Sequence, residues 1–138
     1  MITTHVAEQI DHWLRVLGRP WEPAPGDRFV VPGRDIDDVF VIAEMTVDVE
    51  DLPSGRLVRF NGTTEWALDS IPAADVLWLP WEHQLRAMLG AAFGSLERTP
   101  DGYVVRLADG AAYPGDDAEA AYAAAVLALA DSALADPL

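Results

Sequence analysis

A regular alternation of side chains between Asp38 and Glu50 constrains the fold more than any other feature of the sequence. Every odd position from 39 to 49 carries Val, Ala or Met, whereas the even positions begin with Phe40 and Ile42 and then turn polar and acidic. A period of two residues is typical of a β-strand, because successive side chains point to opposite faces. The segment therefore predicts one long strand whose first half is covered on both faces.

Turn signals around this segment predict antiparallel pairing. The stretch DLPSG leads into RLVRF at 56–60, and Asn61-Gly62, a strong hairpin signal, leads into TTEWAL at 63–68. In this meander Asp48 and Glu50 can lie across from Arg56 or Arg59. The stretch LERTPDGYVVRL at 96–107 predicts a second hairpin, and VLWL at 76–79 a short strand.

Three segments show helical patterns. Apolar residues recur at helical spacing from 4 to 17, with Thr4 as the expected N-cap and Gly18 as the stop. A second helix is expected from Pro80 to Phe93, with Trp81 on its buried stripe, because proline favours the first turn. The alanine-rich segment 116–135 predicts a third helix, and its stripe, which should face the sheet, consists of Tyr122, Val126, Leu129 and Ala133.

Together these patterns predict a single α+β domain spanning residues 1–138. An antiparallel sheet of about six or seven strands would be covered by an N-terminal, a middle and a C-terminal helix. Leu127 and Leu134 lie away from the expected stripe of the last helix. Two alternatives remain for them: the helix is wedged deeply into the core, or it offers a seam to a second copy of the chain.

The charge and the missing residue types exclude several classes of function. The formal net charge is −14, which disfavours binding to DNA, RNA or anionic lipid and attracts basic proteins. All nine basic residues are Arg, so Schiff-base and phosphate-loop chemistry through lysine is absent, and without cysteine there is no thiol catalysis. No signal-peptide pattern and no run of 18 apolar residues occurs. We expect a cytoplasmic protein without a cofactor.

His83 is the candidate for acid–base catalysis, with Glu65 and Asp69 as carboxylates that the fold could bring towards it. No catalytic motif accompanies it. On a helix that starts at Pro80, Glu82 and His83 point away from the buried stripe, and Glu82 can pair with Arg86 at i+4. This favours a solvated helix face over a catalytic site.

Two groups of side chains imitate metal sites without completing them. His5 and His12 are two helical turns apart, about 10.5 Å along the axis, which is too far for one zinc ion. The stretch RDIDD, with Asp35, Asp37 and Asp38, lacks the later glycine and glutamate of a calcium loop. The sequence predicts no metal site.

Five tryptophans mark the core and a candidate interface. Trp13 and Trp81 lie on helical stripes and Trp66 in an expected strand, which favours core positions. Trp21 in the proline-rich connector and Trp78 at the end of VLWL are the natural anchors of an interface if they are exposed. With Leu127 and Leu134 they form the predicted interaction residues.

Four stretches carry a family resemblance: FNGTTEWALDS, VLWLPWEHQLRAMLG, LERTPDGYVV and AEAAYAAAVLAL. Across residues 28–130 the chain resembles an uncharacterised family of small acidic proteins from GC-rich bacteria, some of them labelled as pilus-assembly proteins of the CpaE type. That label implies an ATPase with a phosphate loop, and this chain has neither the loop nor a lysine for it. The resemblance implies one conserved architecture and transfers no site residue.

The predicted function is a non-enzymatic interaction module, adaptor or immunity-like, that binds a protein partner. A basic partner and a second copy of the chain are both open. The alternative is a small enzyme or ligand-binding protein with a pocket between sheet and helices, which uses His83 and a nearby carboxylate.

Overall fold

The computed structural model describes residues 1–32, 39–42, 47–53, 55–60, 70–72 and 75–135. These residues belong to two compact units. Unit 1 comprises Met1–Arg19 and Pro80–Leu138, and unit 2 comprises Pro20–Leu79. Helices and antiparallel strands occur together in the chain, which confirms the α+β class. That both units form one domain stays a prediction.

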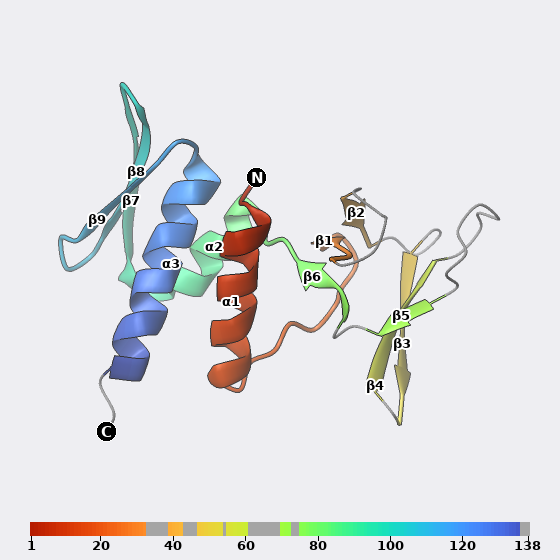
Figure 1. The fold of residues 1–138 in the computed structure, drawn as a ribbon. Helices are drawn as coiled ribbons and strands as arrows, with labels where there is room; N and C mark the ends of the chain where they lie inside the picture. The colour runs from red at the N-terminus through yellow and green to blue at the C-terminus, as the bar shows by residue number, and fades with distance from the viewer. Residues whose placement is uncertain (33–38, 43–46, 54, 61–69, 73–74, 136–138) are drawn as a thin grey trace. The chain divides into compact units, whose positions relative to one another are not determined.

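Unit 1 is a layer of three helices against a three-stranded sheet (Figure 1). The sheet has the order β7-β8-β9 and is antiparallel. Helix α3 packs on β8 and β9, and both α1 and α2 pack against α3. The elements of unit 1 are α1 (Thr4–Val16), α2 (Glu82–Leu89), the 3-10 turn η2 (Gly90–Ala92), β7 (Phe93–Thr99), β8 (Gly102–Leu107), β9 (Ala112–Gly115) and α3 (Ala118–Ala135).

The N-cap of helix α1 lies one residue earlier in the chain than the sequence suggested. Thr3, not Thr4, is the N-cap, and its hydroxyl accepts a hydrogen bond of 3.2 Å from the backbone N–H of Val6. Two adjacent threonines serve equally well as caps in a sequence pattern, so only the backbone distinguishes them. Gly18 has φ +73° directly after the helix, as expected for a residue that stops it.

Helix α2 is shorter than predicted, because it starts at Glu82 and not at Pro80. Trp81 is the N-cap, and its backbone N–H donates to the side-chain oxygen of Gln84 at 2.8 Å. Leu85 and Leu89 are buried, whereas Trp81 is only half-buried. The placement of Trp81 on the buried stripe was therefore wrong: a residue that caps a helix lies outside the helical period.

Helix α3 approaches its sheet closely through small residues. Ala121, Ala123 and Ala125 are buried, and a Cβ added to Gly115 of β9 would lie 2.9 Å from the Cα of Ala121. The predicted sheet-facing stripe was right about the burial of Tyr122. It was wrong for Val126, Leu129 and Ala133, which line a groove between the helices. Helical periodicity identifies the apolar face of α3. The small alanine side chains, however, let the helix approach its sheet more closely than the larger residues of the predicted stripe would.

Unit 2 contains two small antiparallel sheets in its described part. In the first, β1 (Arg28–Val30) lies between β2 (Phe40–Val41) and β6 (Leu77–Trp78), and its Phe29 is fully buried. Phe29 pairs in register with Phe40 on one side and with Trp78 on the other. The second sheet has the order β3 (Val47–Leu52), β4 (Gly55–Phe60) and β5 (Ser70–Pro72).

The expected single sheet of six or seven strands is not found in the described part of the chain. The described strands form three separate three-stranded sheets, and the alternating segment 38–50 supplies β2 to one sheet and β3 to another. An alternating pattern determines which face a side chain takes, but it contains no information about the neighbouring strand. The predicted strand at 76–79 and the hairpins β3–β4 and β7–β8 are confirmed, and Asp48 lies opposite Arg59 in register. The Asn61-Gly62 hairpin lies outside the described residues.

Candidate functional site

Trp21 and Trp78 form an aromatic stack inside unit 2. Their ring centroids are 6.1 Å apart and their planes differ by 3°. The indole N–H of Trp21 donates to the buried carboxylate of Asp27 at 2.9 Å, which fixes the ring. The indole N–H of Trp78 is buried and has no hydrogen-bond partner in the described part of the chain. Both rings are thus accounted for by the packing of unit 2, and their role in binding a partner stays a prediction.

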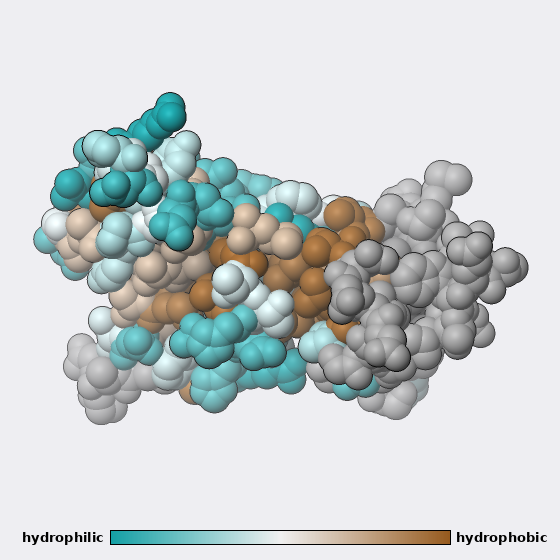
Figure 2. Space-filling view, turned by 45° about the horizontal axis from the view of Figure 1, so that its top comes forward, coloured by the Kyte–Doolittle hydropathy of each residue, from teal (hydrophilic) through white to brown (hydrophobic). Residues whose placement is uncertain are grey.

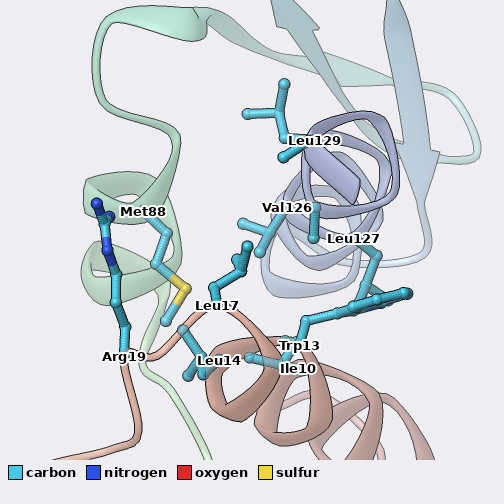
Figure 3. Close-up of a pocket in the computed structure, with 11 residues that line it drawn as sticks. Ile10, Trp13, Leu14, Leu17, Arg19, Met88, Val126, Leu127 and Leu129 are labelled. Atoms are coloured by element: carbon cyan, nitrogen blue, oxygen red, sulfur yellow. The ribbon is translucent and has the colours of Figure 1, made fainter. Parts of the chain in front are cut away.

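The three helices of unit 1 enclose an apolar hollow of about 280 Å³, which we call the three-helix groove. Figure 3 shows Leu14 from α1, Leu17 just after it and Met88 from α2 converging on the groove, with Val126 opposite and Leu127 beside Trp13. The groove is lined by Ile10, Trp13, Leu14, Leu17, Arg19, Met88, Val126, Leu127, Leu129, Ala130 and Ala133.

Apolar surface reaches solvent at the α1 side of this groove. Leu17 lines the groove and remains 41% exposed, and its neighbour Val16, which does not line it, is 51% exposed. Arg19 is the single charged residue in the lining. Figure 2 shows hydrophobic atoms exposed between hydrophilic ones on this face of the molecule. Of the predicted seam residues, Leu127 is half-buried in the groove, and the side chain of Leu134 lies outside the description.

His83 lies exposed in a second hollow of about 340 Å³ at the start of α2, lined by Trp81, Glu82, His83, Arg86 and Tyr122. We call it the Tyr122 hollow. In the described part of the chain His83 makes no hydrogen bond or ion pair, so no carboxylate orients its ring. Glu65 and Asp69, the carboxylates proposed for it, lie outside the described residues. A general base without an orienting partner is a weak candidate for catalysis.

Arg86 does not form the i+4 ion pair with Glu82 that the sequence suggested. Its guanidinium lies over the ring of Phe93 instead, 4.4 Å from the centroid. A guanidinium stacked on an aromatic face keeps its N–H groups free at the edge. The arginine therefore presents a fixed positive charge in the Tyr122 hollow.

Tyr122 lines the hollow and is 2% exposed. Its ring contacts Phe93 with centroids 5.8 Å apart. Burial raises the pKa of the Tyr122 hydroxyl; the positive charge of Arg86 opposes this rise, and Glu82 adds to it. Within the described residues the hydroxyl makes no hydrogen bond. The sequence pattern marked Tyr122 as core, and only the fold brings it to residues of α2.

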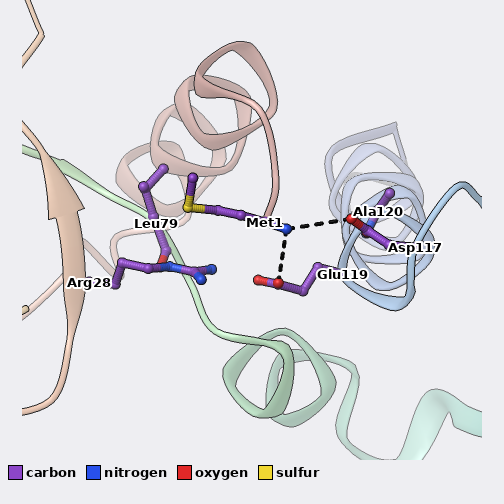
Figure 4. A network of polar contacts seen from close by, with 6 residues as sticks. All are labelled: Met1, Arg28, Leu79, Asp117, Glu119 and Ala120. Atoms are coloured by element: carbon purple, nitrogen blue, oxygen red, sulfur yellow. Dashed lines mark hydrogen bonds and ion pairs between the residues drawn. The ribbon is translucent and has the colours of Figure 1, made fainter. Parts of the chain in front are cut away.

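A polar contact joins the N-terminus to the start of α3. The amino group of Met1 lies 3.4 Å from the Asp117 carboxylate and 3.2 Å from that of Glu119 (Figure 4). The hydrogen bond to Glu119 is the largest cause that raises the pKa of this amine, and burial opposes it. The contact contributes to unit 1 and creates no site.

Other candidate ligands do not gather in space. No group of three His, Cys, Asp or Glu side chains that could hold a metal occurs among the described residues. His5, Glu8 and His12 border a shallow surface hollow along α1, and Asp35, Asp37 and Asp38 lie outside the description. No described helix has the length and apolar character needed to cross a membrane.

Comparison of the chain with protein-family models, with curated proteins and with solved structures finds no match. The resemblance to small acidic proteins of GC-rich bacteria therefore stays a prediction.

Proposed function

We propose that the protein is a non-enzymatic interaction module of the cytoplasm, and that its three-helix groove binds an amphipathic helix of a basic protein partner. The observation that carries the proposal is the groove itself: an apolar hollow of about 280 Å³ with one charged lining residue. Concave apolar surface bordered by polar residues is typical of sites that receive apolar side chains of a partner.

The dimensions of the groove suit a short helical segment. The wall formed by α1 and its C-cap runs from Ile10 to Leu17, which are seven positions apart, or about 10.5 Å at 1.5 Å per residue. The same length separates positions i and i+7 on a partner helix, so apolar side chains at i, i+3 or i+4, and i+7 would enter together.

The charge of the chain supports a basic partner. At a net charge of −14, two copies repel each other, whereas a positively charged helix is attracted and steered towards the surface. The attraction is screened by salt, so the association should weaken as ionic strength rises. An adaptor or an immunity-like protein that neutralises a basic target would both have this behaviour.

Two neighbouring substitutions at the end of α1 provide a matched test. Leu17→Glu places a charge in the groove, and Val16→Glu makes the same change one residue away, outside the lining. Burying the exposed 41% of Leu17 contributes about 0.6–1.2 kcal/mol, and desolvating a glutamate adds to the loss. We expect at least a tenfold weaker association for Leu17→Glu.

The experiment is affinity capture from an extract of the source cells, with captured proteins quantified for the wild type and both variants. We expect the wild type to capture one or more basic proteins. The Val16→Glu variant should still capture them, the Leu17→Glu variant should not, and added salt should release them. Equal capture by both variants contradicts the proposal. The alternative occupant of the groove is a second copy of the chain, and light scattering tests it by measuring the molar mass in solution. A wild-type dimer that Leu17→Glu dissociates would assign the groove to this second copy.

A further inference from the structure

Tyr122 supplies the Tyr122 hollow with a hydroxyl that has no hydrogen-bond partner among the described residues. Tyr122 is 98% buried, lines the hollow, and its hydroxyl forms no hydrogen bond with the described residues. Among the described residues the hydroxyl oxygen is not one of the fully buried unpaired atoms, so the small exposed part of Tyr122 includes this hydroxyl and a ligand in the hollow can reach it. Because burial keeps this hydroxyl protonated, it is a hydrogen-bond donor.

Arg86 supplies the second group. It is exposed, is fixed over Phe93 at 4.4 Å, and makes no ion pair in the described part of the chain. A guanidinium binds a carboxylate through two parallel hydrogen bonds, and a phenol can donate to the same group. Arg86 and Tyr122 together thus match one carboxylate.

Glu82 and Trp81 limit the ligand further. Glu82 lines the same hollow, so a simple anion would be repelled both by it and by the net charge of −14. A zwitterion avoids this, because its ammonium group can pair with Glu82 while its carboxylate binds Arg86. The half-buried ring of Trp81 offers an apolar wall for a side chain.

We propose that the Tyr122 hollow binds a free α-amino acid with an aromatic or large apolar side chain. Arg86 and the Tyr122 hydroxyl bind its carboxylate, Glu82 its ammonium group, and Trp81 its side chain. At about 340 Å³ the hollow is near the lower limit of small-molecule sites, which suits a ligand of this size. The site is independent of the three-helix groove.

The test is an NMR titration of the full chain with L-phenylalanine, compared with phenylalaninamide and with 3-phenylpropionate. The first analogue lacks the carboxylate and the second lacks the ammonium group. We expect saturable shifts around Trp81 and Arg86 with a Kd of about 1 mM, and at least tenfold weaker binding of both analogues. Phenylalanine that causes no saturable shift, or an analogue that binds as tightly, overturns the proposal.

Variants separate the site from unspecific binding. Tyr122→Phe and Arg86→Gln should each weaken phenylalanine binding about tenfold, whereas Arg98→Gln, an exposed arginine on β7 outside the lining, should leave it unchanged. Leu17→Glu should also leave phenylalanine binding unchanged, because Leu17 lies outside the Tyr122 hollow. The amino-acid proposal and the groove proposal can therefore each fail while the other stands. If Arg86→Gln and Arg98→Gln weaken binding equally, Arg86 acts only through the overall charge of the protein. That result would overturn its assignment as the residue that binds the carboxylate.

Discussion

Removal of the Tyr122 hydroxyl tests whether this group really lacks a partner. A typical hydrogen bond contributes about 0.5–1.5 kcal/mol to stability, and its loss would destabilise the protein by that amount. The Tyr122 hydroxyl has no such bond in the described structure, and its ring packing on Phe93 is kept by phenylalanine. At neutral pH Tyr122→Phe should therefore change the free energy of unfolding by no more than about 0.5 kcal/mol.

The same variant should differ from the wild type at alkaline pH. The folded-state pKa of Tyr122 is raised above the ordinary value of 10.0, so above that pH the folded chain holds more protons than the unfolded chain. Stability is thus unaffected below pH 10.0 and falls as the pH rises through the folded pKa. Tyr122→Phe lacks this ionisation and should lose less stability on going from pH 7 to about pH 11.

Urea unfolding of both proteins at the two pH values measures these differences, and their midpoints are compared at equal slope. Trp21→Phe is a useful contrast, because the indole N–H has a partner: its loss leaves the buried Asp27 with one hydrogen bond fewer and should cost about 1–3 kcal/mol. A loss above about 1.5 kcal/mol for Tyr122→Phe at neutral pH would mean that the hydroxyl is already paired. That result would refute both this reasoning and the proposed amino-acid site.

Three further changes test the packing of unit 1. Gly115→Ala should destabilise it by about 1–3 kcal/mol, because the new Cβ meets the backbone of α3; an unchanged Tm would show that the approach is less close. Leu85→Ala, at a fully buried position, should cost about 2–5 kcal/mol in urea unfolding, and a cost below about 1 kcal/mol would contradict its core position. Glu119→Gln should lower the pKa of the Met1 amine, which NMR titration measures. The stabilisation from the contact between Met1 and Glu119 is present below pH 8.0 and declines as the pH rises through the raised pKa.

The sequence predicted local structure well because local signals are short-range. The 3.6-residue period of α1 and α3, the turn in LERTPDGYVV and the short strand before Pro80 all depend on neighbouring residues, and each was found close to its expected place. The errors at Thr4 and Pro80 concern helix ends, where two adjacent residues can serve the same purpose.

The tertiary arrangement was harder to predict, because it depends on partners far apart in sequence. Nothing in the segment 38–50 indicates that β2 pairs with β1 and β3 with β4. The Tyr122 hollow also depends on tertiary packing, because the sequence pattern places Glu82 and His83 together but pairs Arg86 with Glu82 and puts Tyr122 in the core. The stacking of Arg86 on Phe93 and the position of Tyr122 against α2 follow from packing that a linear pattern does not contain.

The stack of Trp21 on Trp78 has a consequence for the modularity of the chain. These residues lie at the two ends of unit 2, and the pairing of β1 with β6 holds the same two ends together. A segment whose ends meet can be inserted into or excised from a host with a short linker, as in tolerated domain insertions. Unit 2 therefore has the geometry of an inserted segment, which the chain enters after α1 and leaves before α2 at neighbouring points.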